Sequence, residues 1–139
     1  MKVIVLGGFL GSGKTSLLLL FLQHLVSKLP DNGKRSLIVI ENEIGQTGID
    51  DKILKSAGLS VQGLESGCAC CEMNADLLMC VNRIQANLSP QWLIIEASGV
   101  AVPSNIVETL ALHGQGITSI KNVVVADAER LENIKKHMR

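Results

Sequence analysis

The sequence has very few aromatic side chains: its 139 residues include one Trp, two Phe and no Tyr. Proteins that bind single-stranded nucleic acid stack bases on such side chains, so the composition disfavours that class. No net charge is present either, because thirteen Lys and Arg side chains balance thirteen Asp and Glu. With no overall field to attract polyanions, we expect neither a nucleic acid nor a membrane surface as a partner.

Long apolar runs are absent as well. The most apolar stretch, residues 17–22, is followed at once by Gln23 and His24, whereas a membrane span needs about 20 apolar residues. This stretch predicts a helix buried on most of its surface beside a parallel sheet. The N-terminus has no basic region ahead of an apolar segment and cleavage site, so we expect no secretory signal and a cytoplasmic location.

The strongest feature that is present is a glycine-rich motif at residues 8–15, GFLGSGKT, which matches the pattern GxxxxGK[ST]. The apolar run Val3–Leu6 predicts a buried strand before it, and Ser16–Leu29 predicts a helix after it. In that setting the loop N–H groups cradle a phosphate at the helix N-terminus, Lys14 reaches the β and γ oxygens, and the Thr15 hydroxyl ligates Mg²⁺. The motif predicts that the chain binds a nucleoside triphosphate.

Strand and helix patterns alternate along the rest of the chain. Further strands are predicted at 36–40, 59–64, 92–95 and 120–126, and further helices at 50–57, 74–88, 103–112 and 129–137. Near-continuous apolar strands that alternate with helices predict a parallel sheet covered on both faces. We therefore predict one domain over residues 1–139 with an α/β, three-layer, parallel-sheet P-loop NTPase fold.

A second phosphate-site element follows the predicted strand at 92–95, where the sequence reads Glu96-Ala97-Ser98-Gly99. An acidic residue at the carboxyl end of a strand beside the phosphate loop is placed to hold Mg²⁺, directly or through water. Gly99 offers an unobstructed N–H to a γ-phosphate, and hydrolysis would release this segment to move. The alternative is that Glu96 is only a solvated carboxylate at a strand end, but ligands of open α/β sheets gather at this edge.

Three of the four cysteines lie within residues 67–72, GCACCE. A reducing compartment disfavours disulfides, so metal binding or redox chemistry becomes the expectation, and thiolates suit Zn²⁺ and similar ions. Because adjacent side chains diverge, we expect one or two sulfurs plus ligands from elsewhere. Glu41 and Glu43 follow the second strand on the same predicted sheet edge and are candidate co-ligands. Alternatively the cysteines pack under a tight loop; Cys80, within a helix, is predicted to belong to the core.

With these motifs together, the sequence resembles the N-terminal GTPase domain of the CobW-type metallochaperones, relatives of the nickel-insertion GTPases for urease and hydrogenase. The GCxCC element between the two switch segments is specific for this group, whereas the phosphate loop alone is shared by many NTPases. The matching segments cover about positions 3–127: Gly7–Thr15, Glu41–Gly45, Gly48–Asp50, Gly67–Cys71, Glu96–Gly99 and Val123–Ala128.

The resemblance implies GTP hydrolysis with Mg²⁺, coupled to binding of Zn²⁺ or Co²⁺ and its delivery to a client metalloprotein. A nucleotide-dependent homodimer is a further expectation. The residues implied in catalysis are Lys14, Glu96 and Asp50, and those implied in nucleotide binding are Gly8, Gly11, Ser12, Gly13, Lys14, Thr15, Ser16 and Gly99. The implied metal ligands are Thr15 and Glu96 for Mg²⁺, and Cys68, Cys70 and Cys71 for the transition metal, with Glu41 and Glu43 as candidate co-ligands from their place at the sheet edge.

The sequence departs from the family in two respects. The guanine-reading Asn/Thr-Lys-x-Asp motif does not occur before Arg139, and the family's C-terminal domain is absent. GTP rather than ATP therefore rests on the resemblance alone, and we expect an incomplete GTPase domain. Gln46 also stands where the family often carries an acidic residue, which predicts a weaker metal site.

Two other functions compete with the metallochaperone interpretation. A nucleotide-gated metal sensor or buffer with negligible turnover is the main alternative, because no strong general base is evident. Turnover stimulated by metal or by a partner would distinguish the two. A small-molecule kinase shares the phosphate loop, but it usually needs a basic lid, and no Arg-rich segment precedes Arg130.

Overall fold

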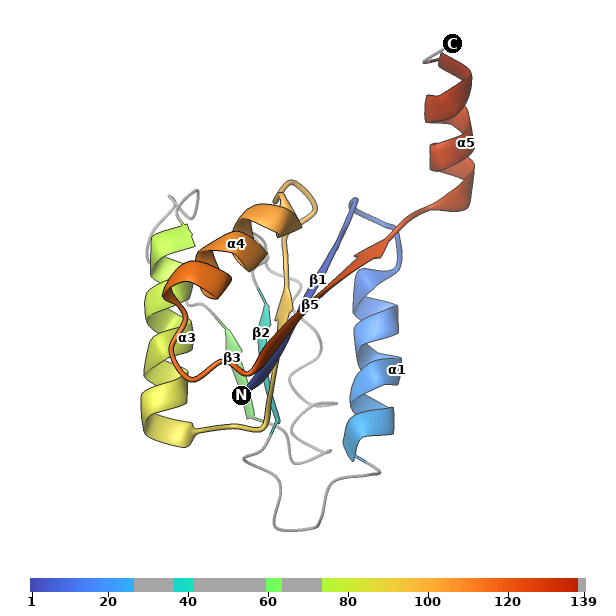
Figure 1. The fold of residues 1–139 in the computed structure, drawn as a ribbon. Helices are drawn as coiled ribbons and strands as arrows, with labels where there is room; N and C mark the ends of the chain where they lie inside the picture. The colour runs from blue at the N-terminus through green and yellow to red at the C-terminus, as the bar shows by residue number, and fades with distance from the viewer. Residues whose placement is uncertain (27–36, 42–59, 64–73, 138–139) are drawn as a thin grey trace.

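The computed structural model describes residues 1–26, 37–41, 60–63 and 74–137, which form a parallel sheet with helices on both faces (Figure 1). The elements in chain order are β1 (Lys2–Gly8), α1 (Lys14–Val26), β2 (Leu37–Glu41), β3 (Ser60–Gly63), α3 (Asn74–Leu88), β4 (Trp92–Glu96), α4 (Pro103–His113), β5 (Ser119–Val125) and α5 (Ala128–His137).

Every strand pair is parallel, and the strand order is β3-β2-β4-β1-β5. Leu6 of β1 is in register with Glu96 of β4, and Glu96 is in register with Glu41 of β2. The carboxyl ends of these three strands therefore meet at one edge of the sheet. Ligands of open α/β sheets bind at such an edge, outside the carboxyl ends of the strands.

The core has two parts, one on each face of the sheet. Successive strand residues point to opposite faces, so Val3 and Val5 belong to one apolar cluster while Ile4 and Leu6 belong to the other. On the first face the helices contribute Leu77, Val81 and Ile84 of α3 and Ile106 and Leu110 of α4. On the second face α1 contributes Leu18 and Leu22. This arrangement confirms the predicted three-layer α/β fold.

The predicted strands and helices that fall in the described ranges are present, with small shifts at their ends. The first helix begins at Lys14, two residues earlier than predicted, because the Gly13 carbonyl already accepts a hydrogen bond from the Leu17 N–H (2.9 Å). The phosphate loop thus runs directly into α1. The helix predicted at 50–57 lies outside the described residues.

The prediction that the apolar stretch of α1 is buried on most of its surface is wrong. Leu18 and Leu22 are fully buried, but Leu17 is 38% exposed and Leu20 is 64% exposed. The reason is that α1 lies in an outer layer beside the sheet (Figure 1). Its fully buried residues, Leu18 and Leu22, are four positions apart and therefore lie on one side of the helix.

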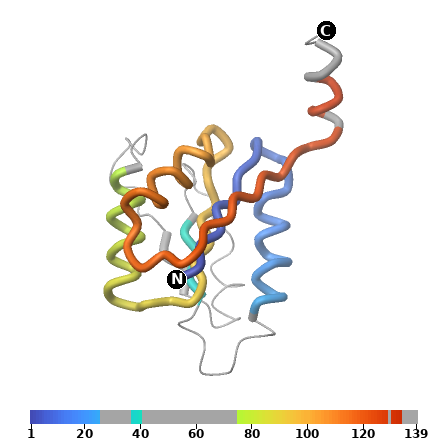
Figure 2. The backbone as a smooth tube through the Cα atoms, in the orientation of Figure 1, coloured from blue at the N-terminus to red at the C-terminus, as the bar shows by residue number. Residues whose placement is uncertain are grey.

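After β5 the chain leaves the sheet, and α5 projects beyond the edge where the β1–α1 loop lies (Figure 2). β5 forms one edge of the sheet and pairs only with β1 among the described strands, with Val125 in register with Gly8. Within the described ranges, no helix has the length and apolar character needed to cross a membrane.

Candidate functional site

The glycine-rich motif forms the loop between β1 and α1. The Ser12 N–H donates to the Phe9 carbonyl (3.1 Å), which turns the chain back on itself. Gly13 has a φ of 91°, a left-handed conformation that glycine adopts without steric cost. The first N–H groups of a helix have no intrahelical acceptors and carry partial positive charge. The start of α1 therefore offers backbone donors to an anion.

Lys14 is the cation of this loop. Its side chain is 6% exposed, and its Nζ donates to the Phe9 carbonyl at 3.0 Å. A buried ammonium is costly unless it is paired, and a phosphate oxygen is a stronger partner than a neutral carbonyl. The Ser12 hydroxyl oxygen is also buried, and it has no hydrogen-bond partner among the described residues. Both polar groups fit a loop that receives an anionic ligand.

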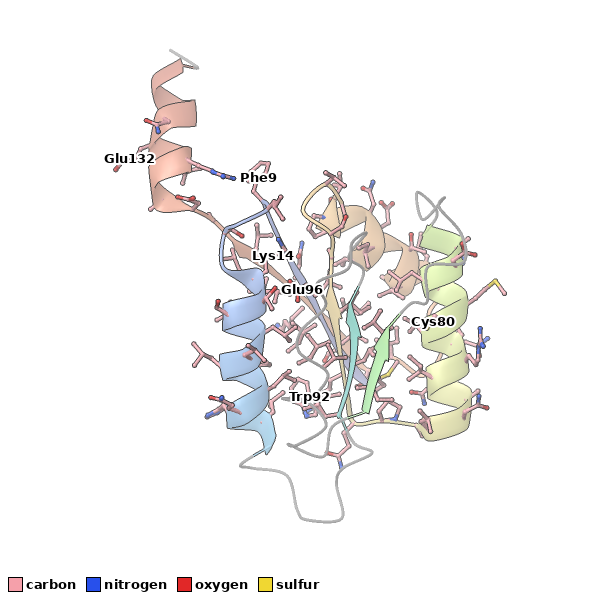
Figure 3. The ribbon with its side chains drawn as sticks, turned by 180° about the vertical axis from the view of Figure 1, so that it is seen from behind. Phe9, Lys14, Cys80, Trp92, Glu96 and Glu132 are labelled. Carbon is pink, nitrogen blue, oxygen red and sulfur yellow. The ribbon has the colours of Figure 1, made fainter. Side chains whose placement is uncertain are left out.

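Glu96 joins the loop to the end of β4. The Thr15 Oγ1 donates a 2.9 Å hydrogen bond to Glu96 Oε1, and the Glu96 side chain is 6% exposed. Figure 3 shows Lys14 and Glu96 at the same end of the sheet, with Trp92 at the other. The structure thus brings two residues that are distant in the sequence into direct contact at the site.

The segment after Glu96 lies against the phosphate loop. A Cβ atom built on Gly99 would lie 2.9 Å from the Leu10 backbone nitrogen, so this position has no room for a side chain. The Ala101 N–H donates to the Ser98 carbonyl (3.0 Å) and forms a turn that keeps Gly99 at this place. A backbone this close to the loop can respond to the ligand that the loop holds.

The sequence-predicted site residues divide into two groups. The members of the phosphate loop and of the segment after β4 come together, namely Gly8, Gly11, Ser12, Gly13, Lys14, Thr15, Ser16, Glu96 and Gly99. For Glu41 the main chain is described, and it lies beside Glu96 in the register of β2 and β4. Outside the described residues lie Glu43, Asp50, Cys68, Cys70 and Cys71. Among the residues that are described, no three His, Cys, Asp or Glu side chains could together hold a metal ion.

Cys80 of α3 is only half-buried, where the sequence predicted a core position. It packs against the cluster formed by α3, α4 and the sheet. Burial raises the pKa of the Cys80 thiol above its ordinary value, and the nearby Arg83 charge opposes this rise. A thiol with a raised pKa is a poor metal ligand at neutral pH, because the thiolate is the form that binds.

We expect Cys80 to react slowly with iodoacetamide. In a variant with Cys68, Cys70 and Cys71 changed to Ser, the remaining thiol should react more slowly than free cysteine at pH 8, because a raised pKa lowers the thiolate fraction. The rate should keep rising with pH beyond the point at which free cysteine levels off. If Cys80 and free cysteine reacted at the same rate at every pH, the assignment of a raised pKa would be contradicted.

One residue at the site was not identified as functional from the sequence. Arg130 of α5 donates from Nη1 to the Leu10 carbonyl of the phosphate loop at 2.9 Å. The sequence signal that could have identified Arg130 is Asp127, a helix N-cap residue that follows a strand whose end lies beside the loop. Arg130 comes three positions after Asp127, in the first turn of the helix.

The sequence matches one protein family over nearly its whole length. The family described as "CobW/HypB/UreG, nucleotide-binding domain" matches residues 2–139. Among solved structures, that of HypB from Helicobacter pylori in complex with nickel gives a TM-score of 0.38 at 16% identity, over 99% of this chain and 85% of that chain. The structural similarity is too low to support an inference about ligands.

Curated relatives are similar over most of the chain. The zinc chaperone YjiA of Escherichia coli is 31% identical over 91% of this chain and 42% of its own length. The zinc-regulated GTPase metalloprotein activator 1 of Dictyostelium discoideum is 34% identical over 88% of this chain and 27% of its length. The zinc chaperone CobW of Pseudomonas aeruginosa is 32% identical over 92% of this chain and 34% of its length. The chain therefore spans less than half of the length of these relatives.

Proposed function

Because the chain belongs to the CobW/HypB/UreG nucleotide-binding family, we propose that it binds and hydrolyses GTP with Mg²⁺ and couples the nucleotide state to binding and delivery of a transition metal. The observation that carries the nucleotide part is the 2.9 Å hydrogen bond between Thr15 Oγ1 and Glu96 Oε1. It joins the end of the phosphate loop to the end of the neighbouring strand.

The residues of the loop have separate roles in this proposal. The N–H groups at the start of α1 bind phosphate oxygens, and Lys14 exchanges the Phe9 carbonyl for the β and γ oxygens. The backbone at Gly99, which lies against Leu10, binds the γ-phosphate and moves when that group leaves. Asp50 belongs to the first switch segment and helps to position water.

The two oxygens at the end of the loop fit Mg²⁺. The Thr15 hydroxyl and the Glu96 carboxylate are hard oxygen donors of the kind that Mg²⁺ prefers, and the structure holds their oxygens 2.9 Å apart. When bound, the ion neutralises negative charge on the β and γ phosphates. Thr15 and Glu96 would hold it, and the low exposure of Glu96 would limit competition by water.

The transition metal is a cargo rather than a resident cofactor, and we assign its binding to Cys68, Cys70 and Cys71, with Glu41 and Glu43 as candidate co-ligands. The relatives are named as zinc chaperones, which favours Zn²⁺ over Co²⁺. Glu41 lies beside Glu96 in adjacent strands, which are separated by about 4.8 Å. One carboxylate-bearing position of the proposed cargo site is therefore a neighbour of the Mg²⁺ site, which supports coupling between the two.

The partners in this proposal are GTP, the metal ion and a client metalloprotein, with a nucleotide-dependent homodimer and a cytoplasmic location. The alternative is a nucleotide-gated zinc sensor or buffer with negligible turnover. It is favoured by one observation: Glu96, the carboxylate that contacts the phosphate loop, accepts the Thr15 hydroxyl and is assigned here to Mg²⁺ rather than to accepting a proton from water.

The coupling predicts that a non-hydrolysable GTP analogue with Mg²⁺ tightens Zn²⁺ binding about tenfold, within the range usual for coupled sites. The Zn²⁺ and Co²⁺ affinities are measured by competition with a chromophoric chelator, with and without the analogue. By reciprocity, saturating Zn²⁺ must tighten binding of the analogue by the same factor. An ATP analogue in parallel tests the preference for guanine.

Two variants make this experiment specific. The change of Cys68, Cys70 and Cys71 to Ser should remove the nucleotide-sensitive Zn²⁺ binding, while the matched change Cys80→Ser should preserve it. A Zn²⁺ affinity that changes neither with the analogue nor with the triple substitution would refute the coupling. Phosphate release from GTP, measured on the same samples, distinguishes the two functions, because the sensor retains the coupling without turnover.

A further inference from the structure

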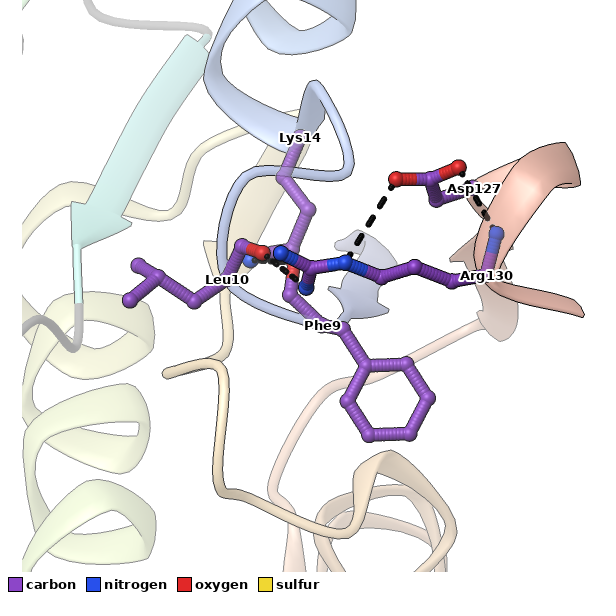
Figure 4. Close-up of polar contacts among 5 residues, drawn as sticks. All are labelled: Phe9, Leu10, Lys14, Asp127 and Arg130. Atoms are coloured by element: carbon purple, nitrogen blue, oxygen red, sulfur yellow. Dashed lines mark hydrogen bonds and ion pairs between the residues drawn. The ribbon is translucent and has the colours of Figure 1, made fainter. Parts of the chain in front are cut away.

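The hydrogen bond between Arg130 and the phosphate loop links the last described helix to the nucleotide site. Arg130 Nη1 lies 2.9 Å from the Leu10 carbonyl oxygen, 120 positions away in the sequence (Figure 4). The Arg130 side chain is 59% exposed, and it comes from an element that the phosphate-loop motif does not include.

Asp127 directs Arg130 toward the loop. Its Oδ1 accepts the Arg130 backbone N–H (3.2 Å) at the start of α5, and its Oδ2 lies 3.7 Å from the Arg130 Nε (Figure 4). Asp127 comes two positions after Val125, whose register partner in β1 is Gly8, the first residue of the phosphate loop. The pairing of β5 with β1 thus delivers both residues to the loop.

The hydrogen bond to Leu10 has a consequence for the next residue. The Leu10 C=O and the Gly11 N–H belong to one planar peptide group and point in opposite directions. A donor that holds the carbonyl therefore also fixes the direction of the N–H. The loop repeats this arrangement one residue earlier, where Lys14 Nζ holds the Phe9 carbonyl.

The hydrogen bond from the Ser12 N–H to the Phe9 carbonyl closes a turn around this peptide, but it does not by itself decide which way the Leu10 carbonyl points. Gly11 has a φ of 79°, and apart from Gly11 itself and its two chain neighbours no atom lies within 4 Å of the position that a Cβ would occupy. Since glycine tolerates positive and negative φ about equally, the Leu10–Gly11 peptide could rotate at small cost. The guanidinium selects one of its orientations, and the positive charge polarises the Gly11 N–H on the other side of the peptide.

We propose that Arg130 is a positioning residue for nucleotide binding: by holding the Leu10 carbonyl it fixes the Gly11 N–H as a phosphate donor. The inference rests on the proposed nucleotide-binding function of the loop. The planar guanidinium, with donors in a fixed fork, serves Asp127 and Leu10 at once, which a lysine ammonium cannot do with the same geometry.

The test compares Arg130→Ala, Arg130→Lys and the matched control Arg83→Ala, an exposed arginine of α3. Affinity for a non-hydrolysable GTP analogue with Mg²⁺ should fall about tenfold in Arg130→Ala. This is the low end of the effect expected for loss of a hydrogen bond to a charged group, because solvent screens the exposed Arg130 side chain. Arg130→Lys should recover only part of this affinity. Arg83→Ala should bind like the unmodified chain.

A second measurement reports the peptide itself. In the nucleotide-free protein, the Gly11 amide resonance in a ¹H–¹⁵N spectrum should shift in Arg130→Ala and stay in place in Arg83→Ala. An unmoved Gly11 amide, or an affinity within twofold of the unmodified chain, would overturn the proposal. Failure of the unmodified chain to bind the analogue would instead overturn the proposed function, so the two failures are distinguishable.

Discussion

The change Lys14→Met should reduce affinity for the GTP analogue about 1,000-fold. The ammonium is 6% exposed, and its described partner is the neutral Phe9 carbonyl, so it exchanges a modest hydrogen bond for a charge-assisted one when phosphate binds. Removal of one member of a buried charge pair costs about 4 kcal/mol, which corresponds to about 1,000-fold in the dissociation constant. Methionine keeps the apolar stem and removes the charge.

The matched control is Lys121→Met, which removes an exposed lysine from β5. It should bind the analogue like the unmodified chain, and isothermal titration at two salt concentrations measures both variants. The thermal midpoint of Lys14→Met should not fall, because the change removes a desolvated cation without leaving a cavity. Retained tight binding in this variant would show that Lys14 does not contact the nucleotide.

A second large effect is expected for Glu96→Gln, which should raise the Mg²⁺ concentration needed for tight binding of the analogue about 100-fold. Glutamine keeps the shape and an oxygen that can accept the 2.9 Å hydrogen bond from Thr15, but it lacks the charge that attracts the cation. Hydrolysis of GTP should fall by a similar factor, since the ion stabilises charge on the transferred phosphate.

The nucleotide itself provides the internal control for Glu96→Gln. In EDTA, binding of GDP should stay equal or become tighter, because a carboxylate near the phosphates is removed. The matched surface change Glu108→Gln, on the exposed side of α4, should leave the Mg²⁺ dependence unaltered. An unchanged Mg²⁺ requirement in Glu96→Gln would exclude Glu96 from the Mg²⁺ site.

Much of the fold could be predicted because local patterns and burial agree along this chain. The helix α3 was predicted at its observed bounds, since its apolar residues repeat at helical spacing and Pro90 follows its end. The burial of α1 was predicted wrongly, because a run of leucines has no polar side to reveal which stripe faces the sheet. Leu20 is as apolar as Leu18, yet only Leu18 is covered.

The candidate site was predictable where one segment carries the chemistry. The residues 8–15 contain the turn, the cation and the hydroxyl that we propose for Mg²⁺ together, so the motif predicted them without the fold. Five predicted site residues remain predictions because they lie outside the described residues. They are the proposed metal ligands Cys68, Cys70 and Cys71, the candidate co-ligand Glu43, and Asp50 of the first switch segment.

The sequence by itself determined that this chain forms a parallel α/β sheet, carries a phosphate loop and concentrates three cysteines in one short segment, because each of these properties is local in the chain. Only the tertiary structure decided the strand order β3-β2-β4-β1-β5, the hydrogen bond of Thr15 with Glu96 and that of Arg130 with Leu10. These hydrogen bonds join residues 81 and 120 positions apart. Such pairings depend on which strands become neighbours, and that choice is made by packing of the whole domain rather than by any one segment.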